Sequence, residues 1–295
     1  MKRLLIIGCG DIARRVIPLL NPHYRVYAVV RSKNQVAELR TLGVTPIFAD
    51  LDEPQTLKRL TGLANIVLHF APPQESGPHD RRTRALVSTL AKAKILPQRL
   101  IYISTSGVYG NCNGEIVSET RATHPQTPRA LRRADAEAVL RRFGQRSNVA
   151  VSILRVPGIY AADRLSLDRL RRGDPVLLRN EDVYTNHIHA DDLAAIVLAA
   201  LWAGRSGRVY NAVDDSDQKM GDYFDEIADA FGLPRAPRVS RAEAQTRLTP
   251  AMLSFMGESR RLKNTRMKRE LNVRLRYPKI ADGLAAARQN VMQHK

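Results

Sequence analysis

Cysteine and tryptophan are scarce in this chain of 295 residues, which contains two cysteines and one tryptophan. Cys9 lies inside a glycine-rich segment and Cys112 lies in a polar stretch, and neither has a partner at metal-ligand spacing. The sequence therefore predicts neither a disulfide framework nor a zinc site. We expect Cys9 to be a small buried residue.

Long apolar runs are also absent, although apolar residues make up 44% of the chain. None approaches the roughly 18 residues that can span a membrane. The apolar stretch after Arg3 ends at Gly8, so it is shorter than the core of a signal peptide. We therefore expect a cytoplasmic protein that does not engage membranes.

Acidic residues are few relative to basic ones, with 29 against 47, which gives a net charge of +18. Such a charge can indicate a nucleic-acid partner. The arginines, however, form scattered pairs such as Arg14-Arg15 and Arg260-Arg261, and no nucleic-acid-binding motif accompanies them. We expect no specific nucleic-acid partner, whereas the charge would attract small anionic ligands, phosphorylated ones included.

Short apolar runs alternate with amphipathic helical patterns through most of the chain. Strands are expected at 4–7, 25–30, 44–49, 66–70, 100–104, 149–154 and 208–210. Helices are expected between them at 11–20, 34–41, 54–60, 80–93, 130–143 and 191–203. Strands separated by helices pair in parallel through right-handed crossovers. The sequence thus predicts an α/β fold with a doubly wound parallel Rossmann sheet of about seven strands.

A glycine-rich turn follows the first expected strand, in the sequence Gly8-Cys9-Gly10-Asp11-Ile12-Ala13. A strand, a G-x-G-x-x-G/A turn and a helix in this order form the dinucleotide-binding fingerprint. Gly8 permits the tight turn and Gly10 lets the backbone approach a pyrophosphate. The helix that begins at Asp11 and Ile12 offers free N–H groups to the anion. An ordinary strand–loop–helix corner is the alternative, because short glycine motifs also occur by chance.

The end of the second expected strand bears on the choice between NAD and NADP. An acidic residue there accepts from the ribose 2′-hydroxyl, whereas arginine pairs with a 2′-phosphate. This chain has Arg31, Ser32 and Lys33, which are two cations and a hydroxyl without a carboxylate. Because a guanidinium can hold a phosphate through two hydrogen bonds, the sequence predicts NADP, with NAD as the alternative.

Two further strand ends contribute candidate cofactor contacts. The third strand ends at Asp50 and Leu51, where the carboxylate could accept from an adenine amino group or could simply begin a helix. The fourth strand ends in Phe70, Ala71 and Pro72, a turn that could line the nicotinamide-ribose side.

The pattern changes after Asn211, where helical segments at 219–231, 240–256, 260–271 and 279–293 are separated by prolines. We predict an NAD(P)-binding Rossmann domain over 1–211 and a small, mostly helical C-terminal substrate lobe over 212–295, with a contribution from 160–187. Ligands of such sheets bind beyond the carboxyl ends of the strands, so we expect the lobe to cover that crevice.

Four segments carry longer motifs. Residues 103–110 (ISTSGVYG) are similar to an S-S/T-x-x-V-Y-G strand end, and 154–160 (LRVPGIY) to an L-R-x-x-x-x-Y segment. Residues 186–194 (NHIHADDLA) are similar to an H-V-x-D-x-A helix start, and 209–212 (VYNA) to a Y-N-V strand. With them the chain resembles, over nearly its whole length, the extended short-chain dehydrogenase/reductase superfamily. The likeness is to the NAD-dependent epimerase/dehydratase-like proteins and their atypical members. The resemblance implies a seven-stranded Rossmann sheet with a small C-terminal substrate lobe.

The chain departs from that family at its catalytic helix. The family's P-Y-x-x-x-K motif is replaced by a segment with Arg129 at the Tyr position and Arg133 at the Lys position. The resemblance implies that Arg133 could still bond the nicotinamide ribose. A guanidinium stays protonated, so Arg129 cannot serve as the family's proton-transferring Tyr. We expect Arg129 to face the crevice and bind an anionic group of the substrate. An exposed helix with two surface cations is the alternative.

Two residues of the fifth-strand motif are also candidates through the resemblance. Thr105 matches the family's catalytic Ser/Thr, whose hydroxyl orients the substrate oxygen. Dehydratase members carry Asp-Glu directly after it, whereas this chain has Ser106 and Gly107, which argues against sugar dehydration. Tyr109 fits a structural role within the motif better, yet it is the nearest Tyr that could replace the missing acid.

These features predict an NADP-binding, atypical short-chain dehydrogenase-like protein, either an oxidoreductase or an epimerase of a small polar or nucleotide-activated metabolite. A non-catalytic NADP-binding sensor is the alternative, which the loss of the Tyr-Lys pair favours. His187 and His189 lie near Asp191 and Asp192, but a strand–helix junction with a capping Asp explains them better than a metal, and we expect none.

Overall fold

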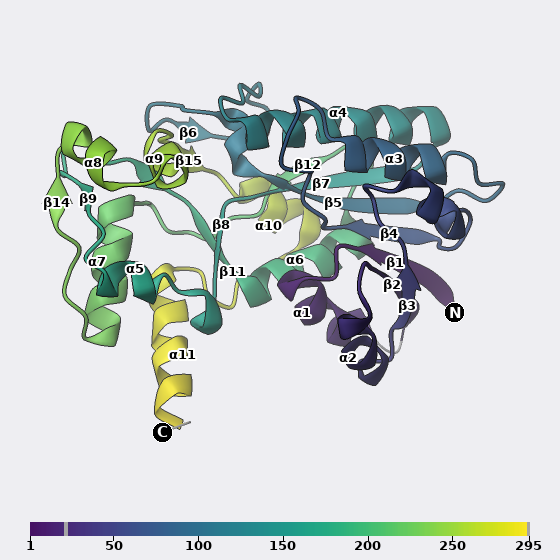
Figure 1. Ribbon diagram of the computed structural model, residues 1–295, viewed down its shortest axis with the longest axis horizontal. Helices are drawn as coiled ribbons and strands as arrows, with labels where there is room; N and C mark the ends of the chain where they lie inside the picture. The colour runs from purple at the N-terminus through teal and green to yellow at the C-terminus, as the bar shows by residue number, and fades with distance from the viewer. Residues whose placement is uncertain (21–22, 294–295) are drawn as a thin grey trace.

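A computed structural model describes residues 1–20 and 23–293 and contains a seven-stranded central sheet (Figure 1). All neighbouring strands pair in parallel. Their order across the sheet is β12 (Val209–Asn211), β7 (Ala150–Val156), β5 (Arg99–Thr105), β4 (Ile66–His69), β1 (Lys2–Ile7), β2 (Tyr24–Val30) and β3 (Thr45–Phe48). The predicted doubly wound Rossmann sheet is confirmed.

Helices cover both faces of the sheet, because its central strands are apolar on both sides. In β1, Leu4 and Ile6 contribute to one core while Leu5 and Ile7 contribute to the other. The first core is covered by α1 (Asp11–Leu20), α2 (Val36–Thr41), α6 (Ala190–Ala203) and α10 (Thr265–Leu271). The second is covered by the 3-10 helix η2 (Pro54–Leu60), α3 (Arg81–Leu90) and α4 (Pro128–Ser147). Figure 1 shows α3 and α4 on one side of the sheet and α1 and α6 on the other.

Three expected helices differ in the structure. Residues 54–60 form a 3-10 helix rather than an α-helix. The expected helix over 240–256 is two helices, α8 (Arg241–Arg247) and α9 (Pro250–Met256), since a proline cannot continue a helix from the preceding turn. The expected helix over 260–271 begins only at Thr265, because β15 (Arg261–Leu262) pairs with β6 (Ile116–Val117).

The part of the chain beyond the sheet draws on segments from both sides of residue 211. Strand β8 (Gly158–Tyr160) pairs with β11 (His187–His189), β9 (Val176–Leu177) with β14 (Arg238–Val239), and β10 (Tyr184–Thr185) with β13 (Gln218–Lys219). A core that includes Tyr160 of β8 and Val176 of β9 is formed with α5 (Leu167–Arg171), α7 (Met220–Phe231) and α11 (Ile280–Gln293). Helix α10 instead joins the core of the sheet, so residues after 211 also brace the Rossmann part. The division at residue 211 stays a prediction.

Two expectations from composition can be compared with the structure. Cys9 is buried, as predicted, and both cysteines are free. In the portions of the chain that the structure describes, no helix has both the length and the apolar character needed to cross a membrane.

A buried ion pair joins α4 to the sheet. Arg155 on β7 donates to both carboxylate oxygens of Glu137 on α4, from Nε at 3.1 Å and from Nη2 at 2.7 Å. Ser104 on β5 donates to the same carboxylate at 2.7 Å. Both charged side chains are only 4% exposed. Because an isolated buried charge is unfavourable, each partner fixes the position of the other.

Removing one partner of this ion pair should destabilise the fold. Glu137→Ala leaves the Arg155 guanidinium buried without its counter-ion, and we expect the free energy of unfolding to fall by about 3–5 kcal/mol. The control is Arg141→Ala, which removes a more exposed cation 3.8 Å from the same carboxylate and should cost less than about 1 kcal/mol. Urea unfolding measures both, and equal small losses would show that the pair does not anchor α4.

Candidate cofactor and substrate site

Two hollows meet at the carboxyl ends of the strands. One, of about 450 Å³, follows the glycine-rich turn and is called the cofactor cleft here. The other, of about 560 Å³, lies between α4 and the C-terminal segments and is called the second pocket. They share four wall residues: Ile103, Ile159, Arg133 and Arg164. A ligand in the cleft would therefore border a ligand in the pocket.

The cofactor cleft brings together most of the residues that the sequence singled out. Its walls include ten of the predicted cofactor contacts, namely Gly8, Gly10, Asp11, Ile12, Arg31, Asp50, Leu51, Phe70, Ala71 and Pro72. Ser32 and Lys33 are not among the wall residues, since the backbone turns into a 3-10 helix there. Gln35 and Arg82 complete this end of the cleft, and sequence reasoning did not find them.

The two glycines of the turn have different physical roles. Gly8 has a φ of +91°, and a Cβ on it would lie 2.5 Å from the backbone nitrogen of Ala71. Gly10 faces open space, because a Cβ there would meet nothing within 4 Å. Gly8 is thus required by the packing of β1 against the end of β4. Gly10 leaves a clear approach to the backbone at the start of α1, which fits a dinucleotide pyrophosphate.

Arg133 stands where the cleft and the second pocket meet. Its Nη1 donates to the carbonyl oxygen of Ile103 at 2.8 Å and to the hydroxyl of Tyr102 at 3.0 Å. These contacts fix the guanidinium at the carboxyl end of β5. Arg133 is therefore held on α4 at a point where it lines both the cofactor cleft and the second pocket.

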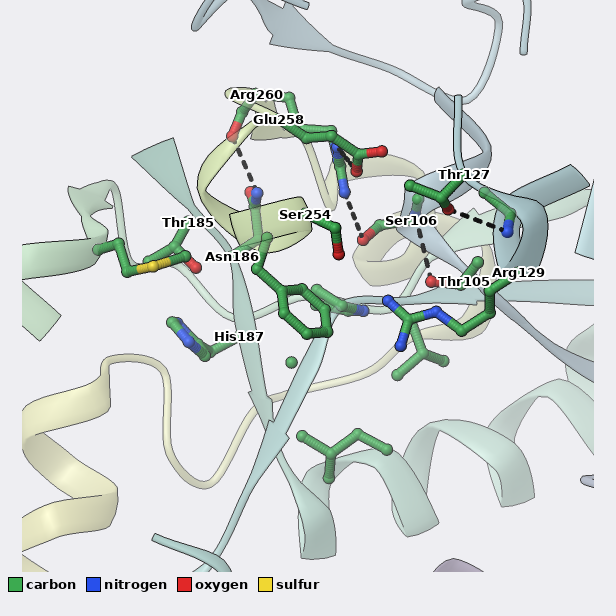
Figure 2. A pocket seen from close by; sticks show the side chains of 18 of the residues that line it. Thr105, Ser106, Thr127, Arg129, Thr185, Asn186, His187, Ser254, Glu258 and Arg260 are labelled. Carbon is green, nitrogen blue, oxygen red and sulfur yellow. Dashed lines mark hydrogen bonds and ion pairs between the residues drawn. The ribbon is translucent and has the colours of Figure 1, made fainter. Parts of the chain in front are cut away.

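The second pocket contains Arg129 and Thr105. The Arg129 guanidinium lies 4.8 Å from the centre of the Phe255 ring and has no hydrogen bond or ion pair with the described residues. Figure 2 shows its side chain extending into the pocket beside Thr105. Arg129 as a whole is exposed, whereas partial burial of its head group lowers its pKa and the Glu258 carboxylate opposes this effect. An unpaired cation in a pocket wall is suited to an anionic ligand.

Tyr109 has no access to either hollow. Its side chain is buried, its hydroxyl donates to Asn211 at 2.8 Å, and the Arg155 guanidinium lies 4.6 Å from the centre of its ring. Burial raises the pKa of its hydroxyl. This geometry argues against Tyr109 as a replacement acid.

The C-terminal segments bring residues to the second pocket that sequence reasoning did not assign to it. His187 is buried with its ring stacked on Tyr223 at 3.9 Å, and burial lowers its pKa to about 3, so it is neutral. Glu258 accepts from Arg260 at 2.7 Å, and Arg260 also reaches toward the Ser106 hydroxyl at 3.5 Å (Figure 2). These contacts join positions far apart in the sequence, which local motifs do not reveal.

The histidines and acids considered as metal ligands have other partners. The expectation of a capping Asp is wrong, because His189 caps α6 by accepting from the backbone nitrogen of Asp191. Asp192 instead accepts from two backbone nitrogens, those of Arg276 and Tyr277. Within the described ranges, no group of three or more His, Cys, Asp or Glu residues could hold a metal ion.

Comparison with known proteins places the chain in a family. Residues 8–203 match the NAD(P)H-binding family, and the chain belongs to it. The dTDP-D-glucose 4,6-dehydratase of Homo sapiens is 25% identical over 241 residues, which cover 71% of this chain and 68% of that protein. An uncharacterized protein of Schizosaccharomyces pombe is 27% identical over 246 residues, which cover 78% of this chain and 79% of that protein.

Solved structures share the fold over nearly the whole chain. A functionally unknown conserved protein from Silicibacter pomeroyi has a TM-score of 0.81 and 28% identity, with 98% of this chain and 99% of that chain covered. The UDP-glucose 4-epimerase of Thermotoga maritima has a TM-score of 0.78 and 19% identity, with 99% of both chains covered. The predicted resemblance to the NAD-dependent epimerase/dehydratase superfamily is confirmed, and the chain is an NAD(P)-binding protein with that fold.

The open space at Gly10 should be essential for cofactor binding and dispensable for folding. Gly10→Val places a branched side chain where the pyrophosphate approaches, so we expect loss of NADPH binding at nearly unchanged thermal stability. Gly8→Ala is the matched control, because its Cβ would clash with Ala71 and should lower the unfolding temperature. Fluorescence titration and thermal unfolding measure both. A stable Gly10→Val protein that binds NADPH normally would contradict the assignment of the cleft.

Proposed function

We propose that this protein is an NADP(H)-dependent oxidoreductase or epimerase that acts on a small anionic metabolite without the Tyr-Lys pair. The observation that carries the proposal is the unpaired Arg129 guanidinium beside Thr105, in a pocket that adjoins the cofactor cleft at Arg133. When bound, the nicotinamide supplies hydride transfer. The chain's own residues bind and orient the two ligands.

The charge of the second pocket supports an anionic substrate. Its wall contains five arginines and one carboxylate, that of Glu258, which already pairs with Arg260. The other four arginines of the wall are Arg129, Arg133, Arg164 and Arg169. A carboxylate or phosphate would find complementary charge there. A nucleotide-activated metabolite meets this requirement, and the epimerase and dehydratase relatives carry nucleotide-sugar names.

Each polar residue has a proposed role. Thr105 accepts from the backbone nitrogen of Gly107 at 3.2 Å, which leaves its hydroxyl hydrogen free to orient a substrate oxygen. Arg129 binds the anionic group, and Arg133 bonds the nicotinamide ribose. We propose His187 as a further neutral donor of the pocket. Its Nδ1 is buried without a partner among the described residues, and its Nε2 lies toward Gly158, another wall residue. We assign the hydrogen to Nε2, from which it can polarise a substrate carbonyl.

A cofactor-binding sensor without turnover is the second candidate. It is favoured by the cations at positions 129 and 133, because neither guanidinium can exchange a proton near neutral pH. Oxidation of NADPH in the presence of anionic carbonyl compounds, followed by the absorbance of the reduced nicotinamide, detects an oxidoreductase. Conversion of UDP-glucose into its epimer, followed by chromatography with the cofactor present, detects an epimerase, which leaves no net change in the cofactor. Together the two assays separate the enzyme from the sensor. Turnover supports the enzyme, and binding without turnover across the panel supports the sensor.

Arg31 should discriminate between the two cofactors. It is exposed at the end of β2 and lines the cleft, where it can pair with the 2′-phosphate. Arg31→Ala should weaken NADPH binding by about 1–3 kcal/mol, the range for hydrogen bonds to charged groups, and leave NADH binding nearly unchanged. Fluorescence titration with both cofactors measures this. Equal losses for both would exclude NADP preference through Arg31.

Arg129 should recognise the substrate and not the cofactor. The anionic probe is UDP-glucose or glucose 6-phosphate, whichever the wild-type protein binds with NADPH present. Arg129→Ala should weaken binding of this probe by about tenfold or more. Its NADPH affinity should stay within about twofold of wild type. Calorimetric titration measures both affinities. Unchanged binding of the anionic probe would show that Arg129 is only a surface cation.

A further inference from the structure

A short segment between β8 and α5 ties the C-terminal part of the molecule to the glycine-rich turn. This segment is the 3-10 helix η4 (Ala162–Arg164), and its two charged residues contact α1. Arg164 donates from Nη1 to Asp11 Oδ2 at 2.8 Å. Asp163 accepts from Arg15 Nη2 at 3.0 Å. The segment thus lies against the start of the helix whose N-terminus faces the cofactor cleft.

Arg15 completes the network on α1. Its Nε donates to Asp11 Oδ1 at 3.0 Å, and its Nη1 donates to Asp191 Oδ1 at 2.6 Å. Asp11 is therefore bonded by two guanidiniums, Arg15 and Arg164, one on each carboxylate oxygen. Burial raises the pKa of Asp11, but the bonds from the two guanidiniums outweigh it and lower the pKa overall, so the carboxylate is ionised at neutral pH.

The position of Asp11 makes this neutralisation significant. Asp11 follows Gly10, the residue with open space for a pyrophosphate, and both line the cleft. A free carboxylate there would repel the phosphates of a dinucleotide. Arg164 lines the cleft as well, and only its Nη1 is bonded. Its Nε and Nη2 have no hydrogen-bond partner among the residues that the structure describes.

We propose that Arg164 is a cofactor-binding residue that donates from its free nitrogens to the dinucleotide pyrophosphate while it remains paired with Asp11. Asp11 then acts as a positioning residue, because it orients the guanidinium toward the glycine-rich turn. This inference depends on NAD(P) binding, which the family shows, and not on the proposed reaction.

The proposal predicts a pattern of cofactor affinities. The pyrophosphate is common to NADPH, NADH and ADP-ribose, so loss of Arg164 should weaken all three alike. This differs from Arg31, whose loss should affect NADPH alone. We expect Arg164→Met to raise the dissociation constants of the three ligands by about tenfold, as for a lost charge-assisted hydrogen bond.

The experiment is fluorescence titration of the full chain, with ADP-ribose measured by competition. Arg171→Met is the matched control, because Arg171 is an exposed arginine nearby whose one ion pair among the described residues is with Asp168. It should bind all three ligands within about twofold of wild type. Thermal unfolding verifies that Arg164→Met is folded, as expected for a side chain that is 37% exposed.

A second variant separates two effects of losing Arg164: loss of its direct contact with the pyrophosphate, and loosening of the η4 segment from α1. Asp163→Asn breaks the ion pair with Arg15 but keeps the Arg164 head group, so it should stay within about twofold of wild type. An equal loss in Asp163→Asn and Arg164→Met would overturn the direct contact. So would unchanged affinities in Arg164→Met, or a loss confined to NADPH.

Discussion

The buried ion pair between Glu137 and Arg155 sets the geometry of the whole site. Arg129, Arg133 and Glu137 recur at intervals of four along α4, so they share one face of the helix. Once Glu137 is fixed against β7 and β5, the other two must lie over the carboxyl ends of the strands. The positions of Arg129 in the second pocket and of Arg133 at the cofactor cleft therefore depend on the Glu137–Arg155 ion pair. That ion pair lies outside both hollows.

The replacement of Tyr and Lys by two arginines changes what the site can do. A tyrosine at position 129 could exchange a proton, whereas a guanidinium can only attract an anion. Arginine in place of the family's Lys at position 133 keeps a donor for the proposed ribose contact, and the carbonyl oxygen of Ile103 fixes it in place. The site thus retains the means to bind a cofactor and orient a substrate. In the proposed reaction, polarisation by Thr105, Arg129 and His187 takes the place of the family's Tyr.

Local patterns predicted the sheet and the cofactor cleft, because both are built from contiguous segments. A buried strand, a glycine turn and a helix start all lie among the first thirteen residues. The sequence of residues 4–13 was therefore sufficient to predict Gly8 and Gly10 as wall residues of the cleft. The second pocket could not be predicted in the same way. His187 reaches it from β11, Tyr223 from α7 and Glu258 from the segment between α9 and β15. The periodic pattern located α7, but β11 pairs with β8 over only three residues, which give no periodic signal.

The splitting of the expected helix at 240–256 shows a different limit. Pro250 is visible in the sequence, and Thr249 caps the second helix by accepting from Met252. This stop signal was available in the sequence, and the single helix predicted over 240–256 ran through it. In contrast, the pairing of β15 with β6 joins residues about 145 positions apart, and only the tertiary structure reveals it.

The most direct test of this account is a crystal structure of the protein grown with NADPH. The account predicts a dinucleotide that runs along the cleft from Arg31 to Arg133, with its pyrophosphate over Gly10 and its nicotinamide at the boundary with the second pocket. Arg129 should remain directed into that pocket beside Thr105. A dinucleotide bound elsewhere, or an Arg129 head group in open solvent away from Thr105, would contradict it.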